Sequence, residues 1–337
     1  MRFSDKVNKR IKIAFVGDIS SSFIKHDYEI LKEYFDVYIF QLPRKKIDWI
    51  KYIFILAKEV KQYDLTFSWF AGWHSALAVF FSKLFRKKSV VVVGGFDAAY
   101  VPEINYGAFT NLKEKIPSKY VLKNADLVLP VSNFVKKEIL DKTKPKQVEV
   151  VYNCVNDRKF KPVEKKENII VTIGRVTKQG IKLKGLETFA KASTYFPDYK
   201  FVIIGEIEKN AVNQLQRNNP KLVFTGKITH DEVLKWLQQA KIYCQLSYME
   251  SFGVGVAEGM SCGCIPIVTD RGGLPEVIGD TGFFVSYGDE KATVEMIKKA
   301  LTLDDDPGGK ARERIKKMFS YKKRREELEK IILGMIS

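Results

Sequence analysis

Two carboxylates and two glycines gather in one short segment of the second half of the chain. Glu250 and Glu258 are separated by seven residues, and Gly253 and Gly255 lie between them. An apolar run, Ile242–Gln245, predicts a buried strand just before this segment, and the pattern after Gly253 predicts a helix. Glycine lets backbone N–H groups approach a ligand closely, and a helix N-terminus favours anions. The segment therefore predicts an anion-binding loop flanked by carboxylates.

The two carboxylates indicate that the ligand also carries hydroxyl groups. A carboxylate only accepts hydrogen bonds, which suits hydroxyls and does not suit phosphate. A nucleotide-sugar offers both groups: a diphosphate for the helix end, and ribose and hexose hydroxyls for the two glutamates. On its own, Glu258 could instead merely stabilise the helix N-terminus.

A second loop, rich in glycine and cations, follows the predicted strand Ile169–Ile173. Its polar positions are Gly174, Arg175, Lys178, Lys182 and Lys184. A departing nucleoside diphosphate gains negative charge as its bond to a sugar breaks, and fixed cations stabilise that charge. The alternative is an ordinary basic surface loop.

Strand-like and helix-like segments alternate along the whole chain, which predicts an α/β fold with parallel, doubly wound sheets. The strands expected in the first half are Ile11–Val16, Asp36–Phe40, Leu65–Trp69, Ser89–Val93, Leu127–Pro130 and Val148–Val151, with helices at Phe23–Tyr34, Asp48–Gln62 and His74–Phe85. Those expected in the second half are Ile169–Ile173, Phe201–Ile204, Leu222–Phe224, Ile242–Gln245, Ile265–Val268 and Gly282–Val285. A polar stretch from Asp157 to Asn168 reads as a linker. We therefore expect two Rossmann-like domains, residues 1–156 and 157–320.

Several of these motifs resemble those of one enzyme family. Glu250 and Glu258, with Phe252-Gly253 between them, are similar to the paired-glutamate signature of family 4 retaining glycosyltransferases, also called glycosyl transferases group 1. The segment from Gly263 to Val268 and the run Gly272-Gly273-Leu-Pro-Glu276 match the same family. The resemblance is strong from Ile169 to Val285 and weaker before that.

The resemblance implies a GT-B fold, in which the two domains face each other across a cleft and the helix at 321–337 packs back on the first domain. It implies a retaining hexosyltransferase that moves a sugar from a nucleoside-diphosphate sugar to a glycan, a lipid-linked sugar or a small molecule. The donor would bind mainly to the second domain. Neither a bound metal nor another cofactor would be needed.

The resemblance also implies roles for individual residues. Glu258 would hold the ribose hydroxyls and Glu250 the transferred sugar, and neither is assigned as a nucleophile. Arg175 and Lys184 would contact the diphosphate beside Gly174, although Lys178 or Lys182 could replace Lys184. Backbone groups would complete the donor site, at Phe252, Gly253 and Val254 for the donor and at Lys227 and Ile228 for the base.

The first domain would supply the acceptor side. Gly17 and Asp18 follow the first strand, where an acceptor loop is expected. Members of the family often carry a His after the fourth strand, whereas this chain has Gly95-Phe96-Asp97. Asp97 could take over that contact. The stretch from Glu103 to Gly107 either lines the acceptor site or is an ordinary polar loop.

The charge balance points to an anionic partner. The chain has a net charge of +17, and residues 1–160 hold 28 Lys and Arg against 17 Asp and Glu. The predicted helices at 48–62 and 74–85 carry basic ends, Pro43–Lys46 before the first and Arg86–Lys88 after the second. They could lie on an anionic membrane or be core helices with solvated ends. No recognition motif for nucleic acid accompanies the charge.

Other features point away from metals and export. The residues His26, His74 and His230 lack metal-ligand spacing. Asp304–Asp306 resembles the metal-binding Asp-x-Asp of other glycosyltransferases, but the following Pro307-Gly308 predicts a solvated turn. The four cysteines show no CxxC pairing and suggest reduced thiols. We expect a cytoplasmic protein that either is free or lies at the membrane surface.

Two rival functions remain open from the sequence. A sugar-nucleotide epimerase also uses two such domains, but it needs neither the glutamate pair nor an acceptor. A non-catalytic homologue that only binds nucleotide-sugar is the second rival, and the unusual Gly95-Phe96-Asp97 loop is what favours it.

Overall fold

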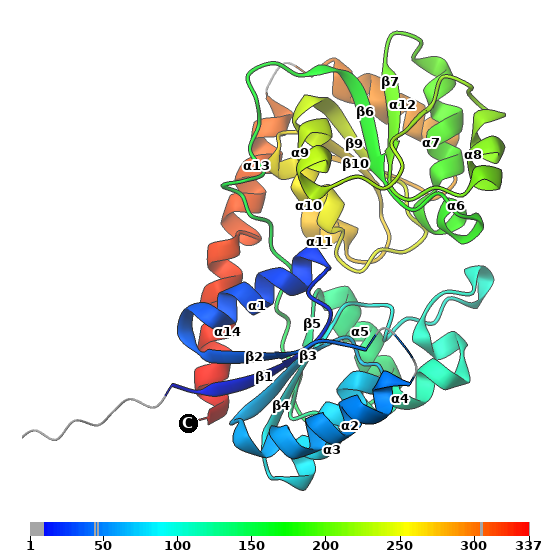
Figure 1. The fold of residues 1–337 in the computed structure, drawn as a ribbon. Helices are drawn as coiled ribbons and strands as arrows, with labels where there is room; N and C mark the ends of the chain where they lie inside the picture. The colour runs from blue at the N-terminus through cyan, green and yellow to red at the C-terminus, as the bar shows by residue number, and fades with distance from the viewer. Residues whose placement is uncertain (1–9, 44, 46, 304–305, 337) are drawn as a thin grey trace, which may run out of the picture. The chain divides into compact units, whose positions relative to one another are not determined.

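The computed structural model describes residues 10–43, 45, 47–303 and 306–336. The chain divides into two compact units (Figure 1). Residues up to Val151 and those from Arg325 onward form the first unit, and Tyr152–Arg324 forms the second.

The first unit is built on five parallel strands in the order β2-β1-β3-β4-β5. Its elements are β1 (Lys12–Val16), α1 (Ser22–Tyr34), β2 (Asp36–Phe40), α2 (Asp48–Glu59), η1 (Val60–Gln62), β3 (Leu65–Trp69), α3 (Trp73–Leu84), β4 (Lys88–Val93), η2 (Pro102–Ile104), η3 (Ala108–Thr110), α4 (Leu112–Asn124), β5 (Leu127–Pro130) and α5 (Asn133–Lys142).

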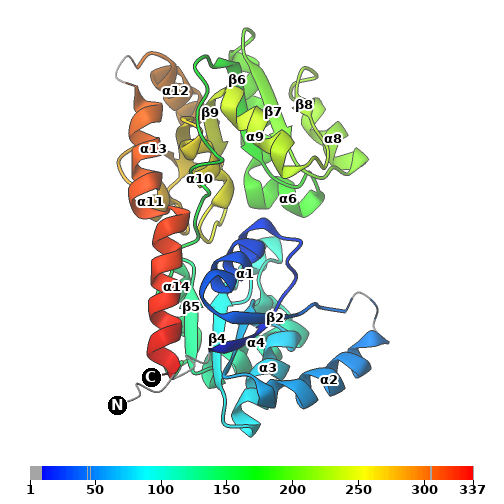
Figure 2. The same cartoon turned by 60° about the vertical axis from the view of Figure 1, so that its left-hand side comes forward.

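Helices α2, α3 and α4 lie side by side on one face of this sheet (Figures 1 and 2). The chain moves in one direction across the sheet from β2 through β3 and β4 to β5, and right-handed crossovers place all the intervening helices on the same face. A core of Tyr52, Leu56 and Val60 packs there against Ala78 and Phe81 of α3. The inner sides of α2 and α3 are thus fully used.

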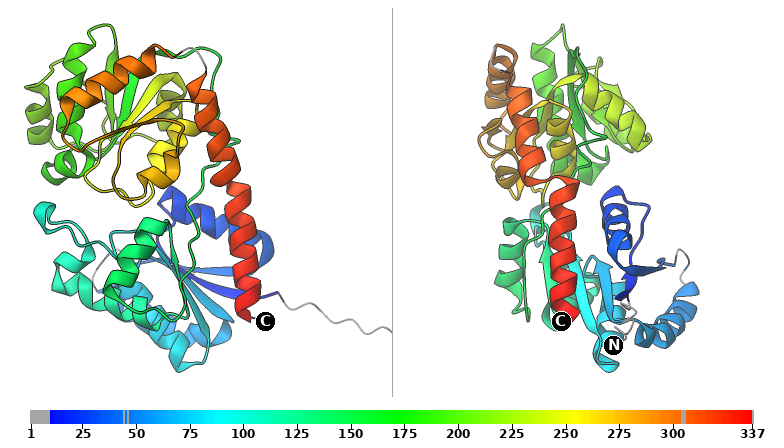
Figure 3. Two further views of the ribbon diagram at one scale, coloured as in Figure 1. Left: turned by 180° about the vertical axis from the view of Figure 1, so that it is seen from behind. Right: turned by 90° about the vertical axis from the view of Figure 1, so that its left-hand side faces the viewer.

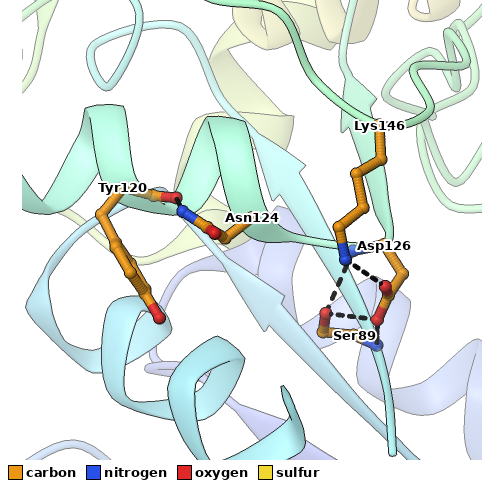
Figure 4. A network of polar contacts seen from close by, with 5 residues as sticks. All are labelled: Ser89, Tyr120, Asn124, Asp126 and Lys146. Carbon is orange, nitrogen blue, oxygen red and sulfur yellow. Dashed lines mark hydrogen bonds and ion pairs between the residues drawn. The ribbon is translucent and has the colours of Figure 1, made fainter.

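A polar network joins the starts of β4 and β5 (Figure 4). The carboxylate of Asp126 accepts hydrogen bonds from the backbone N–H and the hydroxyl of Ser89, at 3.0 and 2.9 Å. Lys146 forms an ion pair with the other oxygen of Asp126 at 2.7 Å. The network fixes the register of the two strands at the edge away from the candidate site loops.

The second unit holds six parallel strands in the order β11-β10-β9-β6-β7-β8. Its elements are β6 (Glu167–Ile173), α6 (Lys178–Lys184), α7 (Leu186–Ala192), η4 (Ser193–Tyr195), β7 (Lys200–Ile204), α8 (Lys209–Gln216), β8 (Val223–Phe224), α9 (His230–Gln239), β9 (Ala240–Gln245), α10 (Val254–Ser261), β10 (Ile265–Thr269), α11 (Leu274–Ile278), β11 (Phe283–Val285), α12 (Glu290–Leu301) and α13 (Pro307–Met318). Helices cover both faces of the sheet (Figure 3).

The strand order in the second unit reverses at β6. The chain leaves β6 toward β7 on one side and returns to place β9 on the other side. Ligands in open α/β sheets bind outside the carboxyl ends of the strands at such a switch point. The loops after β6 and β9 are therefore the place to look for a site, and both carry the motifs singled out in the sequence.

The segment from Tyr152 to Asn156 belongs to the second unit because its backbone is bonded there. The N–H of Val155 donates a hydrogen bond to the carbonyl of Phe319 at 2.9 Å, and the carbonyl of Val155 accepts one from the N–H of Tyr321 at 3.1 Å. The last helix, α14 (Tyr321–Ile336), begins in the second unit and continues in the first, where Arg325 pairs with Glu33 at 3.5 Å.

The prediction of two parallel α/β sheets is confirmed, and β2, β3 and β5 have the predicted bounds. The strand predicted at Val148–Val151 was wrong. This segment forms one isolated bridge, Val128 with Val148, and a few backbone hydrogen bonds to β5. Three backbone hydrogen bonds and one bridge link it and the preceding residue to β5, which is too little pairing for a continuous ladder.

A substitution at Gly107 can test how tightly the loop after β4 is packed. Gly107 has φ +103°, and a Cβ there would overlap the backbone of Ala99. We expect Gly107→Ala to lower the free energy of unfolding by about 2 kcal/mol or more, from strained backbone and overpacking together. Gly334 lies in helix α14 with open space around it, so Gly334→Ala should be neutral or stabilise by up to about 1 kcal/mol. Urea unfolding of both variants checks the pair, and equal effects would contradict the expectation.

Candidate functional site

The loop between β9 and α10 carries the two glutamates and is tightly held. Gly253 has φ +92° and ends the loop, and α10 begins at Val254 as predicted. Gly272 and Gly273 press against the loop so closely that a Cβ on either would overlap the backbone of Glu250 or Ser251. The N–H of Gly273 also donates to the carbonyl of Glu250 at 2.7 Å. The Gly-Gly turn therefore positions Glu250.

The glycines of α10 have a packing role that the sequence analysis did not foresee. A Cβ on Gly255 or Gly259 would collide with the ring of Tyr243, which is fully buried on β9. These glycines let the helix lie close on the strand. Gly255 was expected to open the backbone to a ligand, but its observed contact is with Tyr243.

Glu250 pairs with Lys184 from the other loop. The Nζ atom of Lys184 lies 2.5 Å from Oε2 of Glu250, and the two side chains are 25% and 17% exposed. Lys184 ends α6, and Gly185 follows in the left-handed conformation with its α-carbon against the carbonyl of Leu246. This close approach of backbones brings together two loops that lie more than 60 residues apart in the chain.

The other basic residues of the β6 loop lie differently. Arg175 is exposed and pairs with Glu206 at 2.9 Å. Lys178 and Lys182 belong to α6, and neither makes an ion pair with another residue that the structure describes. Gly174 lies against the side chain of Lys184, where a Cβ would come within 3.0 Å of Cγ. Lys184 is thus the lysine of this loop that contacts a predicted site carboxylate.

Glu258 has a partner that the sequence analysis missed. Its Oε1 lies 2.8 Å from Nε2 of His230, and Glu258 is 6% exposed. The hydrogen bond to Glu258 raises the pKa of His230, against the opposing effect of burial. His230 was considered only as a metal ligand. The capping box of Thr229 and Glu232 fixes the start of α9 and could have indicated that His230 has a defined position.

The loop expected to meet the base lies just before His230. Lys227 and Ile228 follow Gly226, which has φ +70° and open space around it, and Thr229 then caps α9. Phe252 is buried and packs on Phe319 with ring centroids 5.3 Å apart. Its side chain serves the core, which leaves its backbone for a ligand.

The predicted residues of the first unit fall in two places. Asp97 is 3% exposed, and its two oxygens accept from the backbone N–H groups of Ala71 and Gly95, both at 2.8 Å. Burial raises the pKa of Asp97 to about 6 despite these hydrogen bonds. Asp18 instead accepts from the side chain of Gln41 at 2.9 Å, and Gly17 packs near Ile24.

Asp97 lines an apolar pocket in the first unit. The cavity has a volume of about 430 Å³ and is lined by α2, the start of α3, α4 and the loops after β3 and β4. Its walls include Trp49, Phe70, Trp73 and Phe96. By holding both loops through Asp97, the chain fixes one wall of this pocket.

The part of the chain that the structure describes offers no cluster of metal ligands. Among the described residues, no group of three or more His, Cys, Asp and Glu side chains could hold a metal ion. Asp304 and Asp305 lie outside the described residues, and Asp306 caps α13 by accepting from Gly309 at 3.0 Å. All four cysteines lie in the described residues, are buried and take part in no disulfide. No described helix has both the length and the apolar composition that crossing a membrane requires.

Comparison with known proteins identifies the second unit. Residues 155–319 match the family described as glycosyl transferases group 1. This match covers the loops with Arg175, Lys184, Glu250 and Glu258. The matched segment is just under half of the chain and is similar to this family, and the two parallel α/β sheets have the GT-B fold.

Two curated relatives are 28–29% identical to this chain over the regions that align. N-acetyl-alpha-D-glucosaminyl L-malate synthase of Bacillus anthracis is 29% identical over 65% of this chain and 62% of its own. The GPI3 subunit of phosphatidylinositol N-acetylglucosaminyltransferase of Saccharomyces cerevisiae is 28% identical over 60% of this chain and 49% of its own. The matched region is thus less than two thirds of either relative.

Solved structures extend the likeness in fold to almost the whole chain. Sucrose-phosphate synthase from Thermosynechococcus elongatus has a TM-score of 0.79 at 17% identity, covering 97% of this chain and 99% of that one. Anabaena HepE in complex with UDP and glucose has a TM-score of 0.78 at 14% identity, covering 96% of this chain and 100% of that one.

The pairing of His230 with Glu258 predicts a pH dependence of stability. Because the folded-state pKa of His230 is raised, the pair stabilises the fold fully below the unfolded value of about 6.5, and this contribution is lost as the pH rises through the raised folded pKa. His230→Gln should therefore lower the free energy of unfolding by more at about pH 6 than at about pH 9. Urea unfolding of wild type and variant at both pH values measures this, and a pH-independent difference would contradict it.

Proposed function

We propose that the chain transfers a hexose-type sugar from a nucleoside-diphosphate sugar to an acceptor, with retention of anomeric configuration and without a metal ion. The observation that carries the proposal is the ion pair of Lys184 and Glu250 beside the N-terminus of α10. It places a cation for a diphosphate and a carboxylate for sugar hydroxyls within one contact of each other. The family match to the same unit supports it.

The two glutamates are suited to hydroxyl recognition because each has one oxygen already held. Lys184 holds Oε2 of Glu250, and His230 holds Oε1 of Glu258. In each case the second oxygen can accept from a hydroxyl. The held oxygen fixes the orientation of the carboxylate, so little side-chain entropy is lost on binding. We assign Glu250 to the transferred sugar and Glu258 to the ribose.

Cations and backbone dipoles would stabilise the leaving group. As the glycosidic bond breaks, negative charge grows on the diphosphate, and preorganised donors lower the energy of that transition state. Lys184 and the backbone N–H groups at the start of α10 supply such donors, and Arg175 can leave its exposed pair with Glu206 to supply another. Asp97, with both oxygens on backbone N–H groups, acts by shaping the loop on the acceptor side.

The donor and the acceptor are proposed by class. One structural neighbour holds UDP and glucose, and two curated relatives are named for N-acetylglucosaminyl transfer. UDP-glucose and UDP-N-acetylglucosamine are therefore the first donors to test. The acceptor is a glycan, a lipid-linked sugar or a small molecule, and the cytoplasm is the proposed compartment.

Ligand-induced stabilisation tests donor binding first. A ligand at about 100 times its Kd should stabilise the native state by about 2.7 kcal/mol. We expect one of UDP, GDP, ADP and CDP to raise the melting temperature, equally with EDTA and with magnesium. A shift that needs magnesium would contradict metal independence. Absence of any shift would contradict the donor site.

Site variants test the chemistry. Glu250→Gln and Lys184→Ala should each lower the rate of sugar transfer by about 100-fold or more, because each removes an interaction that grows in the transition state. Glu258→Gln should act mainly on donor affinity. Transfer of radiolabelled sugar and the melting temperature are measured for each variant.

Glu187→Ala is the matched control, since Glu187 forms an exposed pair with Lys191 on α7 of the same unit. It should transfer sugar at the wild-type rate. Wild-type rates in Glu250→Gln as well would show that the site is assigned wrongly. Conversion of the donor without any acceptor would favour an epimerase, and donor binding without turnover would favour a non-catalytic homologue.

A further inference from the structure

The outer surface of the first unit is unusually rich in exposed apolar side chains. Of the twenty large apolar side chains that are exposed among the described residues, eleven lie between Ile47 and Ile116. They belong to α2, α3, the loop after β4 and α4, which lie next to one another (Figures 1 and 2). Clusters of this kind mark interaction surfaces, whereas scattered single residues do not.

Helix α2 shows the feature most clearly because it is apolar on two sides. Tyr52 and Leu56 face the core, while Ile50 and Phe54 are 60% and 72% exposed. Ile47, just before the helix, is 71% exposed. A surface helix of a globular protein normally has one apolar face and one polar face. The second apolar face of α2 has no counterpart within the described first unit.

Helices α3 and α4 extend the same surface. Trp73 and Leu84 are 53% and 59% exposed at the two ends of α3, and Leu112 and Ile116 are 70% and 53% exposed on α4. The 430 Å³ apolar pocket opens among them, between Trp73 and Phe96. Two tryptophans, Trp49 and Trp73, line this pocket, and tryptophan favours the boundary between water and lipid.

Basic side chains lie on the same helices as the exposed apolar ones and indicate an anionic partner. Lys51 and Lys58 on α2, Lys83 and Arg86 at the end of α3, and Lys113 and Lys115 on α4 are all exposed. None of these six makes an ion pair with another described residue. The acidic residues of the same helices and loop are Asp48, Glu59, Glu103, Glu114 and the buried Asp97, so cations prevail on the exposed surface. Arg44 and Lys46 lie outside the described residues.

We propose that the outer surface of α2, α3 and α4 docks on an anionic lipid bilayer. Apolar side chains enter the boundary of the acyl chains, and the lysines contact lipid phosphates, as in helices that lie in a membrane interface. The pocket between Trp73 and Phe96 then faces the lipid and accepts an apolar chain. The surface would bind lipid whether or not the chain transfers sugar.

Vesicle binding tests the proposal. The full chain is sedimented with vesicles of phosphatidylcholine alone or mixed with phosphatidylglycerol. It should bind the mixed vesicles, and binding should weaken with salt because the contacts to phosphate are screened. Brominated acyl chains should quench Trp73, and Trp73→Phe should lose that part of the quenching. A protein that stays in the supernatant with both vesicles would overturn the proposal.

Matched variants locate the surface. Ile50→Ser with Phe54→Ser should weaken vesicle binding about tenfold or more. Ile207→Ser with Phe284→Ser removes equally apolar exposed side chains from the second unit and should bind vesicles as wild type does. Lys51→Glu with Lys58→Glu should weaken binding to the anionic vesicles only. Wild-type binding by the α2 variants would overturn the proposal.

Two further measurements distinguish lipid docking from self-association and from donor binding. If Ile50→Ser with Phe54→Ser abolishes a concentration-dependent dimer seen by analytical ultracentrifugation and vesicles do not compete, the surface binds a second copy and the proposal fails. The nucleoside-diphosphate melting shift should be the same in wild type and in the α2 variants, because α2 carries none of the donor-site residues. A lost shift with retained vesicle binding would count against the sugar-transfer proposal alone.

Discussion

The candidate site of the second unit depends on one constraint, the close approach of backbones around the loop after β9. Gly185 presses on this loop from one side at Leu246, and Gly272 and Gly273 press on it from the other at Glu250 and Ser251. A side chain at any of these glycines would push the loop away. Because the loop is packed on both sides, Glu250 is held within reach of Lys184. The same packing fixes where α10 begins, directly after the loop.

Within this frame, charges are arranged in pairs that leave part of each carboxylate available. Lys184 holds one oxygen of Glu250, and His230 holds one oxygen of Glu258. A lone carboxylate at a helix N-terminus would repel a phosphate, but the charge of Glu250 is largely offset by that of Lys184. An anionic ligand with hydroxyl groups can then bind beside two glutamates without a large electrostatic penalty.

In the first unit, helices α2, α3 and α4 have one side in the core and an exposed side that is also apolar. Its strands and the inner sides of α2 and α3 form an ordinary packed core, and Asp97 ties two loops together through backbone hydrogen bonds. The outer sides of α2, α3 and α4 remain apolar and basic at once. Such a combination suits a partner that offers both hydrocarbon and negative charge.

The sequence by itself determined the parallel two-sheet architecture, the strand ends to within two residues, and the segments that carry Glu250, Glu258 and Lys184. Strand-helix periodicity and glycine-rich loops are local signals. The sequence failed at Val148–Val151, where a local β pattern lacked a ladder, and it gave no sign that Gly255 also packs against Tyr243. Only the tertiary structure decided that Lys184 rather than Lys178 or Lys182 meets Glu250, and that His230 holds Glu258. These contacts join residues far apart in the chain, and their geometry is set by how the two loops pack, which no local pattern records.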